Sequence, residues 1–350
     1  MAGNPSGPWT YARSGVDRSE VRTSLQRLLE GVRYHPPPAH GRMVRLPGHY
    51  AGIVRIGRET IAITTDTVGT KSLLAEAMGS WEEVGEDVVA VNANDLASVG
   101  ARPSVLVDCL SVPRPDPEIF AAIGRGIDRG LRAARMHLAG GETAVVPDLV
   151  GHYDLGGTAV GFFPAGRRPV TGAAIRPGDV VLGIPSSGVH ANGLTLLRRL
   201  ISERSVDLRS PRPGATEPVG LEILRATRMY TQLADAVAGR PEVHGFAHIS
   251  GGGVRNLVRL RPQVAFVLDR WPAPAGLFRW IAGLGELAAD ELYQTFNMGI
   301  GFVVIARPSR RSELLRRLAR AGAPDAIEVG HVERGTGVRL PHLGLEFEGY

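Results

Sequence analysis

The eight residues TTDTVGTK, at positions 64–71, decide how this chain is interpreted. They close a β-rich run, so Asp66 is predicted at the end of a strand, with Gly69 in a turn and a helix from about Ser72. Lys71 is the only lysine among the 40 Lys and Arg residues. Because arginine stands at every other such position, we expect Lys71 to occupy a site that the wide, planar guanidinium group does not fit.

Length and composition are those of an ordinary globular protein. The chain has 350 residues, of which 43% are hydrophobic and 21% charged, enough for two domains or one large one. No apolar run reaches the roughly 18 residues that a membrane span needs, so we expect no membrane partner. Residues 1–10 lack the features of a secretory signal and are predicted to be a flexible tail.

Charge and cysteine usage narrow the function classes. The formal net charge is +5, but the basic residues are scattered in runs of at most two. This pattern argues against nucleic-acid binding and is compatible with an anionic small-molecule substrate. Cys109 is the only cysteine, so no disulfide can form within the chain, and we expect a cytoplasmic location. We also expect Cys109 to be buried, because it lies in an apolar strand.

Strand and helix patterns alternate along the whole chain, which indicates an α/β or α+β fold. A stretch rich in Pro, Gly and Arg follows the first group of elements, and we place a domain boundary there, near residue 167. Periodicity predicts the main helices at 17–32, 82–100, 116–134 and 218–238, and the main strands at 51–57, 60–66, 104–112, 156–163, 180–185 and 299–306.

Four polar, glycine-marked segments interrupt the first half: LPGHYAG (46–52), TTDTVGTK (64–71), NAND (92–95, inside a helical pattern) and AGGETA (139–144). None matches the P-loop or the dinucleotide-binding pattern. Their glycines would let backbone N–H groups approach phosphates, and Asp66, Asp95 and Glu142 offer oxygen ligands for Mg²⁺. Each also has a simpler interpretation: Asp66 as a helix cap, Asp95 as a solvated helix residue, the glycines as turns.

The second half has two more such segments. SSGVHANG (186–193) holds His190 and Asn192 before a helix, and HISGGGVRNL (248–257) places three glycines at a helix start, where anions can bind. Taken alone, His190 is slightly better explained as a loop histidine bonded to backbone, and His248 as a packed histidine at a strand end.

Together these segments resemble one family. The strings YARSGVD, GHYAG, TTDTVGTK, NANDLASVGARP, GGETA, YDLGGTAVG, SSGVHANG, AHISGGG and YQTFNMGIGF occur in the order found in phosphoribosylformylglycinamidine cyclo-ligases, also called aminoimidazole ribonucleotide (AIR) synthetases. The match runs from about residue 11 to about residue 335. The D-x-V-G-x-K and N-D-x-x-x-x-G-A-x-P patterns belong to a wider superfamily, whereas the first and last strings are similar to the cyclo-ligases in particular.

The resemblance implies an α/β (α+β) chain of two domains: an N-terminal ATP-binding and dimerisation domain over 11–166 and a C-terminal AIR-synthetase-like domain over 167–345. It also implies a homodimer whose N-terminal sheets form a β-barrel. The implied cofactors are ATP and Mg²⁺. The implied reaction closes the ring of formylglycinamidine ribonucleotide to give AIR, ADP and phosphate in purine biosynthesis, by phosphorylation of the formyl oxygen.

Site residues are carried over from the same motifs. Lys71, Asp95 and His190 would be catalytic. Mg²⁺ would be held by Asp66 and Asp95, with Asp154 or Glu142 as further ligands, and Lys71 would face the ATP phosphates. The implied ATP-binding residues are Gly48, His49, Tyr50, Gly52, Asp66, Gly69, Thr70, Lys71, Asn94, Gly140, Gly141, Glu142 and Thr143. The implied substrate-binding residues are His190, Asn192, His248, Gly251, Gly252 and Gly253.

Several positions depart from the family pattern. ATRMY (226–230) stands where the family often has P-T-R-x-Y, and a lysine that some relatives carry near the first helix is missing, with Arg27 the nearest basic residue. Thr67 stands where the family usually has glycine, and Gly156 stands where it often has alanine. A β-branched residue does not easily adopt a positive φ, so the loop after Asp66 must differ, or that position never needed such a φ. These departures keep two alternatives open: another ATP-using superfamily member, thiamine-monophosphate-kinase-like or hydrogenase-maturation-like, and a catalytically silent nucleotide-binding dimer.

Overall fold

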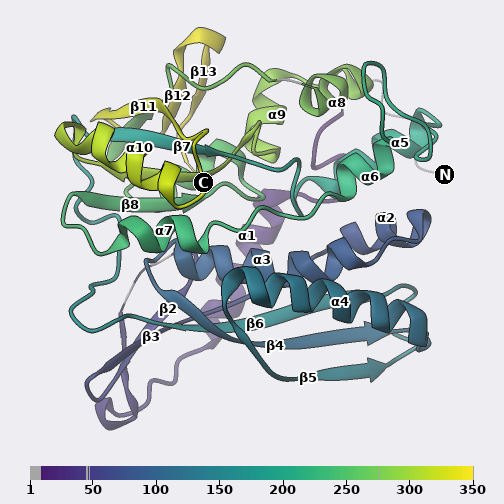
Figure 1. Cartoon of the computed structure of the whole chain (residues 1–350), viewed down its shortest axis with the longest axis horizontal. Coiled ribbons are helices and arrows are strands. Elements are labelled where there is room, and N and C mark those ends of the chain that lie inside the picture. Colours follow the sequence, from purple (N-terminus) through teal and green to yellow (C-terminus); the bar gives the residue numbers. More distant parts are fainter. Residues whose placement is uncertain (1–8, 45, 47, 275, 350) are drawn as a thin grey trace.

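The computed structural model describes residues 9–44, 46, 48–274 and 276–349, so most of the expected tail lies outside the described residues. The chain forms two β-sheets, and each half of the sequence contributes one of them. Helices flank both sheets (Figure 1). The first sheet ends at Phe162 and the second begins at Val180. The predicted division near residue 167 falls in the segment between them, and the exact domain bounds stay a prediction.

The first sheet has six strands in the order β1-β2-β3-β6-β4-β5, and only the β4–β5 pair is parallel. Apolar and polar residues alternate along these strands, so one face is buried and the other is open. The strands are β1 Arg42–Val44, β2 Gly52–Ile56, β3 Glu59–Thr67, β4 Arg102–Val112, β5 His137–Val145 and β6 Asp154–Phe162.

Helices α3 (Glu82–Ala97) and α4 (Pro117–Ala134) lie on the buried side of this sheet. Their backbones approach closely because glycines face each other: a Cβ on Gly126 would lie 1.9 Å from the carbonyl oxygen of Glu82, and one on Gly85 would lie 2.1 Å from that of Ile123. The short helix α2 (Lys71–Met78) joins β3 to α3. On the other face of the sheet, large apolar side chains are exposed, including Ile63.

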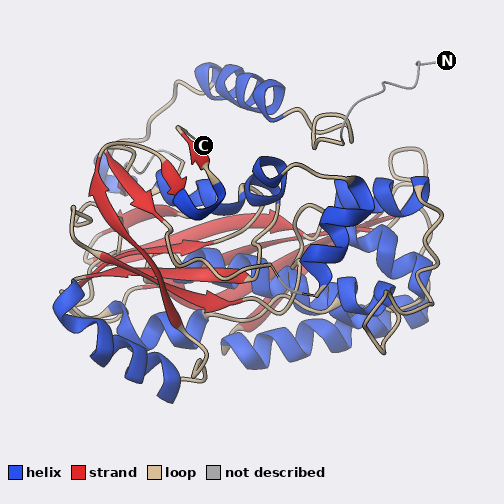
Figure 2. Cartoon of the chain, turned by 90° about the horizontal axis from the view of Figure 1, so that it is seen from above, coloured by secondary structure: helices blue, strands red, loops and turns tan. Residues whose placement is uncertain are grey.

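The second sheet has seven strands in the order β13-β12-β9-β11-β7-β10-β8. Its central strands are apolar on both faces, because helices cover both sides (Figure 2). The strands are β7 Val180–Pro185, β8 Val243–His248, β9 Val264–Val267, β10 Ile300–Ala306, β11 Ile327–Arg334, β12 Val338–Leu340 and β13 Leu345–Phe347. The helices are α5 Leu194–Glu203, α6 Val219–Leu224, α7 Thr231–Ala238, α8 Leu277–Gly285, α9 Ala289–Thr295 and α10 Arg311–Arg320, with 3₁₀ turns at Pro38–His40 (η1), Gly253–Arg259 (η2), Pro308–Arg310 (η3) and Pro341–Leu343 (η4).

Three sequence-based expectations need correction. The AGGETA segment is not a loop: it lies within β5, where parallel pairing with β4 outweighs the poor strand propensity of two glycines. The helix expected over 218–238 is interrupted, with an extended segment at 225–230 between α6 and α7. Cys109 is exposed rather than buried, because its side chain points to the open face of the first sheet.

The amino-terminal helix α1 (Arg18–Gly31) confirms the helix expected at 17–32, with Asp17 as its N-cap. None of its residues is buried, and Figure 2 shows it standing off the body near the N-terminal end. Among the described residues, no helix combines the length and the apolarity that crossing a membrane requires.

Candidate functional site

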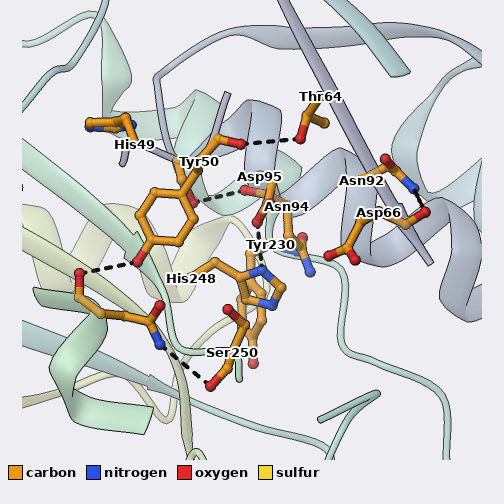
Figure 3. Close-up of polar contacts among 12 residues, drawn as sticks. His49, Tyr50, Thr64, Asp66, Asn92, Asn94, Asp95, Tyr230, His248 and Ser250 are labelled. Carbon is orange, nitrogen blue, oxygen red and sulfur yellow. Dashed lines mark hydrogen bonds and ion pairs between the residues drawn. The ribbon is translucent and has the colours of Figure 1, made fainter. Parts of the chain in front are cut away.

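Two carboxylates and a histidine meet where the two halves of the chain adjoin. Asp66 comes from the end of β3, Asp95 from the last turns of α3, and His248 from the end of β8. His248 Nδ1 donates a hydrogen bond to Asp95 Oδ1 at 3.0 Å, so the pair joins the first half to the second. Figure 3 shows His248 beneath Asp95, with Asp66 to their side. The sequence predictions for these three positions therefore converge on one place.

Burial and a neighbouring charge both act on the Asp66 carboxyl group. Water reaches the Asp66 side chain, but protein atoms crowd around it. This desolvation, and secondly the negative charge of Asp95, raise the pKa of Asp66 to about 6. Two neighbouring carboxylates repel each other, and a divalent cation between them would remove that repulsion.

The loop at 48–52 is tied to the second half across this cluster. The guanidinium of Arg259, in η2, stacks 4.5 Å above the ring of Tyr50 and donates to the carbonyl oxygen of Gly48. The pKa of His49 falls to about 4, because the ring is largely buried and Arg259 lies close. His49 is therefore neutral at pH 7. The structure thus brings the expected loop to the expected carboxylates.

The further carboxylates expected at the metal lie elsewhere. Strand register pairs Asp66 with Gly157 and Gly157 with Asp108, so these three residues share the helix-facing side of the sheet. Asp154 and Glu142 fall at the alternate positions and therefore lie on the open face. The other expected β5 residues are exposed at this edge strand as well. The side chains of Asp154 and Glu142 therefore cannot share a cation with Asp66.

Asp108 was missed by the sequence reasoning. It lies on β4 on the same face as Asp66, two strands away, which is roughly 10 Å. Partial burial raises the pKa of its carboxyl group. The signal was available in SVLVDCLSV: Leu106 and Leu110 face the core, so alternation places Asp108 on their side. No group of three His, Cys, Asp or Glu side chains able to hold a metal is found within the described residues.

Lys71 does not reach this cluster. Its side chain is fully enclosed, forms an ion pair with the equally enclosed Asp87 of α3, and donates to the carbonyl oxygen of Arg225 at 3.0 Å. As it stands, the ammonium group presents no surface that a phosphate could touch. Asn94 is enclosed too: its amide bonds to the backbone of Arg228 and Tyr230, at 2.9 and 2.8 Å. Neither side chain faces the ATP site that the resemblance implied.

His190 also lies in the interior. It has a φ of +61°, and its Nε2 accepts a hydrogen bond from the N–H of Ser187 at 3.3 Å. Burial above all, and then the neighbouring His248, hold its pKa well below the ordinary value. The rings of His190 and His248 are 6.3 Å apart, and both adjoin Tyr230. The structure therefore brings His190 to the edge of the cluster, as a neutral, enclosed group.

The remaining expected substrate contacts divide into open and closed positions. Asn192 is half-buried and Gly251 is exposed, and a Cβ on Gly251 would lie 3.1 Å from Asn192 Oδ1. Gly252 and Gly253 are buried, and a Cβ on Gly253 would lie 2.0 Å from the carbonyl oxygen of Tyr293. Gly253 therefore allows η2 to pack closely on α9, and neither of these buried glycines forms an open anion site.

Positions 67–70 complete the expected loop. Thr67 belongs to β3 and pairs with Gly156 of β6, so it needs no positive φ. Gly69 does have a positive φ, of +55°, and the hydroxyls of Thr70 and Thr195 are 3.2 Å apart. The departure at Thr67 therefore leaves the turn that follows Asp66 in place.

Solved structures show a fold similar to this one. The HypE–HypF complex matches with a TM-score of 0.64 at 16% identity over 93% of this chain and 97% of that chain. AaThiL complexed with AMPPCP and TMP matches with a TM-score of 0.62 at 17% identity over 95% and 96%. At these identities the likeness concerns the fold alone, a mixed α/β arrangement of two domains.

Sequence comparisons identify the family. Residues 48–163 match the N-terminal domain of AIR synthase related proteins, and residues 176–342 match their C-terminal domain. The phosphoribosylformylglycinamidine cyclo-ligase of Methanothermobacter thermautotrophicus is 40% identical over 95% of this chain and 96% of its own length. That of Thermococcus gammatolerans is 39% identical over 96% and 99%. The chain therefore belongs to the phosphoribosylformylglycinamidine cyclo-ligase family of AIR synthase related proteins.

Proposed function

We propose that this chain catalyses the ATP-dependent ring closure of formylglycinamidine ribonucleotide to AIR, with release of ADP and phosphate, in purine biosynthesis. The observation that carries the proposal is the Asp66–Asp95 carboxylate pair, placed by two family motifs at the junction of the two halves. Relatives named for this activity match nearly the whole chain, which favours it over the kinase-like and maturation-like alternatives.

A magnesium ion fits the donor set at this junction. Mg²⁺ in phosphoryl-transfer enzymes usually takes one or two carboxylates together with substrate phosphates. Desolvation, and secondly the charge of Asp95, raise the pKa of Asp66, and a bound cation would oppose both effects. Asp66 and Asp95 would hold the ion, and Asp108 would lie on the same face of the sheet. The bound ion would neutralise charge on the transferring phosphoryl group.

The chain's own residues supply positioning for the reaction. An amide oxygen is a poor leaving group, and its phosphorylation by ATP turns it into a good one. The amidine nitrogen then attacks the formyl carbon, the carbon–oxygen bond breaks, and phosphate departs as the ring closes. We assign the 48–52 loop, held by Arg259, to ATP, and the open contact at Asn192 and Gly251 to the ribonucleotide.

His248 has a supporting task in this scheme. Its Nδ1–H holds Oδ1 of Asp95, which fixes the rotamer of that carboxylate and leaves Oδ2 for the cation. His248 is almost fully buried, so the hydrogen bond is shielded from water. We therefore assign His248 to orienting Asp95, in addition to lining the substrate side of the junction.

We further propose a cytoplasmic homodimer that associates through the open face of the first sheet. The support is the large apolar side chains that this face exposes: Ile63, Val107 and Phe162. A soluble monomer rarely leaves such a set uncovered, and pairing two such sheets would create the β-barrel implied by the resemblance. Sedimentation equilibrium at micromolar concentration tests the proposal, and a monomer under those conditions contradicts it.

The activity is tested directly with purified protein, formylglycinamidine ribonucleotide and Mg-ATP. We expect AIR and ADP in equal amounts. ADP formed only with another acceptor, such as thiamine monophosphate, would support the kinase-like alternative. ATP binding measured by calorimetry, with no turnover on any acceptor, would support the silent nucleotide-binding alternative.

A further inference from the structure

The extended segment at 225–230, here called the bridge segment, is held to the first half of the chain by a buried ion pair. Lys71 donates to the carbonyl oxygen of Arg225 at 3.0 Å and is paired with Asp87. Asp87 Oδ1 accepts a hydrogen bond from the N–H of Thr227 at 2.8 Å. These contacts explain why the helical pattern expected over 218–238 is interrupted here, since the backbone groups bond to the first half instead.

Asn94 adds a second fastening point on the same side. Its Nδ2 donates to the carbonyl oxygen of Arg228 at 2.9 Å, and its Oδ1 accepts from the N–H of Tyr230 at 2.8 Å. Asn94 and Tyr230 are fully buried, and Figure 3 shows Asn94 below Asp95 and beside His248. Both ends of the bridge segment are thus fixed to α2 and α3.

The other side of the bridge segment holds the loop at 186–193, which carries His190 and Asn192. Ser187 Oγ donates to the carbonyl oxygen of Ala226 at 2.6 Å. Tyr230 donates its hydroxyl to the carbonyl oxygen of Pro185 at 2.9 Å, at the start of that loop. The bridge segment therefore lies between the motif that ends in Lys71 and the loop of the second half.

We propose that Lys71 is a positioning residue, which acts through the bridge segment to set the 186–193 loop against the Asp66–Asp95 carboxylates. The charge of the Lys71 ammonium group is compensated by Asp87, and the surrounding protein keeps any ligand away from it. The enclosed space between a carboxylate and a carbonyl suits a compact ammonium group and not a planar guanidinium. The size of this enclosed space explains why the position holds the only lysine of the chain instead of an arginine.

Three variants test the proposal, which rests on the proposed function for its kinetic readout: Lys71→Met, Lys71→Arg and the double variant Lys71→Met/Asp87→Asn. Lys71→Met leaves a buried carboxylate without its partner, so kcat should fall roughly tenfold to hundredfold. The KM for ATP should stay within about twofold, since no contact with ATP is lost. Lys71→Arg should lose as much kcat as Lys71→Met, because the larger group does not fit.

The double variant separates positioning from phosphate binding. It removes both charges but keeps an acceptor for the N–H of Thr227, so we expect most of the lost kcat to return. A lysine that touched a phosphate could not be replaced in this way. The proposal is overturned if the double variant stays as inactive as Lys71→Met, or if Lys71→Arg retains near-normal kcat, or if the KM for ATP rises about tenfold or more.

A structural readout keeps the test independent of the proposed reaction. Hydrogen–deuterium exchange of peptides covering 186–193 should rise in Lys71→Met and return toward wild type in the double variant. Ser187→Ala removes only the hydrogen bond from the loop to the carbonyl oxygen of Ala226, and it should raise the same exchange and lower kcat with an unchanged KM for ATP. Unchanged exchange at 186–193 in Ser187→Ala and Lys71→Met contradicts the proposal even where wild-type protein makes no AIR.

Discussion

Two sequence motifs each supply one residue to the junction between the halves and another residue to the buried interior. TTDTVGTK supplies Asp66 to the junction between the halves and Lys71 to the interior. NAND supplies Asp95 to the junction and Asn94 to the interior. Neighbouring positions of one motif therefore do different work: one set lies where a ligand can reach it, and the other holds the bridge segment.

Charge balance separates the two sets. At the junction, Asp66 lies beside Asp95, and desolvation, followed by the repulsion between the two carboxylates, raises the pKa of Asp66. In the interior, Lys71 and Asp87 cancel each other's charge. An unbalanced pair of like charges is unfavourable unless a ligand compensates it, whereas a balanced buried pair fixes a conformation. The comparison can be tested by changing one member of each set.

The largest effect is expected at Asp95. In Asp95→Asn the amide keeps the size of the side chain but loses its negative charge, so we expect kcat to fall by roughly 10²-fold or more with the fold intact. The matched control is Asp154→Asn, the same chemical change on the open face of the sheet, which should keep near-normal turnover. The measurement is steady-state AIR formation, with circular dichroism to check folding.

Two results would contradict this view of the junction. Near-normal turnover in Asp95→Asn would remove Asp95 from the metal site. A loss of turnover in Asp154→Asn at unchanged dimer affinity would restore Asp154 as a ligand, against the strand register. Either result would contradict the assignment of ligand binding to the helix-facing side of the sheet and of dimer association to its open face.

The second prediction concerns stability in the interior set. Asn94→Ala removes two hydrogen bonds, one from the buried N–H of Tyr230 and one to the partly buried carbonyl oxygen of Arg228. The free energy of unfolding should fall by about 2–4 kcal/mol. The control is Gln232→Ala, which loses one exposed hydrogen bond to Ala133 and should change stability by less than about 0.5 kcal/mol. Denaturant titration of each variant gives the comparison. Equal losses of unfolding free energy in the two variants would show that Asn94 does not hold the bridge segment.

The third prediction follows from the pKa of Asp66, which is about 6 in the folded chain and about 4 when unfolded. Without metal, the folded state holds the proton more tightly, so this group's contribution to stability is full below pH 4 and is lost as pH rises through 6. Binding of Mg²⁺ displaces the proton, so metal affinity should weaken by up to about tenfold per pH unit below 6. Calorimetric titration with Mg²⁺ from pH 5 to pH 8 measures this, and a flat profile contradicts it.

The comparison also shows what the sequence could and could not predict. The strand ending at Asp66 and the helix carrying Asp95 followed from periodicity and are confirmed. The enclosed state of Lys71 did not follow, because its partner Asp87 is a separate position on α3 whose orientation depends on tertiary packing. The face of Asp154 depends on strand register, which a motif does not contain. Periodicity alone could have placed Asp108, since its strand alternates.

The smallest effect is expected at Thr67 and Gly156, two departures from the family pattern that lie opposite each other in the sheet. Thr67 and Gly156 are direct partners across β3 and β6, and a Cβ on Gly156 would lie 3.1 Å from Thr67 Cγ2. Both positions lie on the open face of the sheet, opposite to the face that carries Asp66. Thr67→Gly should leave ATP affinity unchanged and cost about 1 kcal/mol of stability, because threonine favours a strand and glycine does not.

The partnership makes a sharper prediction for the pair. Gly156→Ala alone crowds the methyl group of Thr67 and should destabilise the chain by up to about 1 kcal/mol, whereas the same change in a Thr67→Gly background should be neutral or stabilising. A double-mutant cycle measured by denaturant unfolding gives the coupling. Additive effects would mean that the two substitutions are unrelated. A large loss of ATP affinity in Thr67→Gly would mean that Thr67 itself contacts the ligand at the junction. A residue of the open face would then take part in ATP binding, against the assignment of that binding to the helix-facing side.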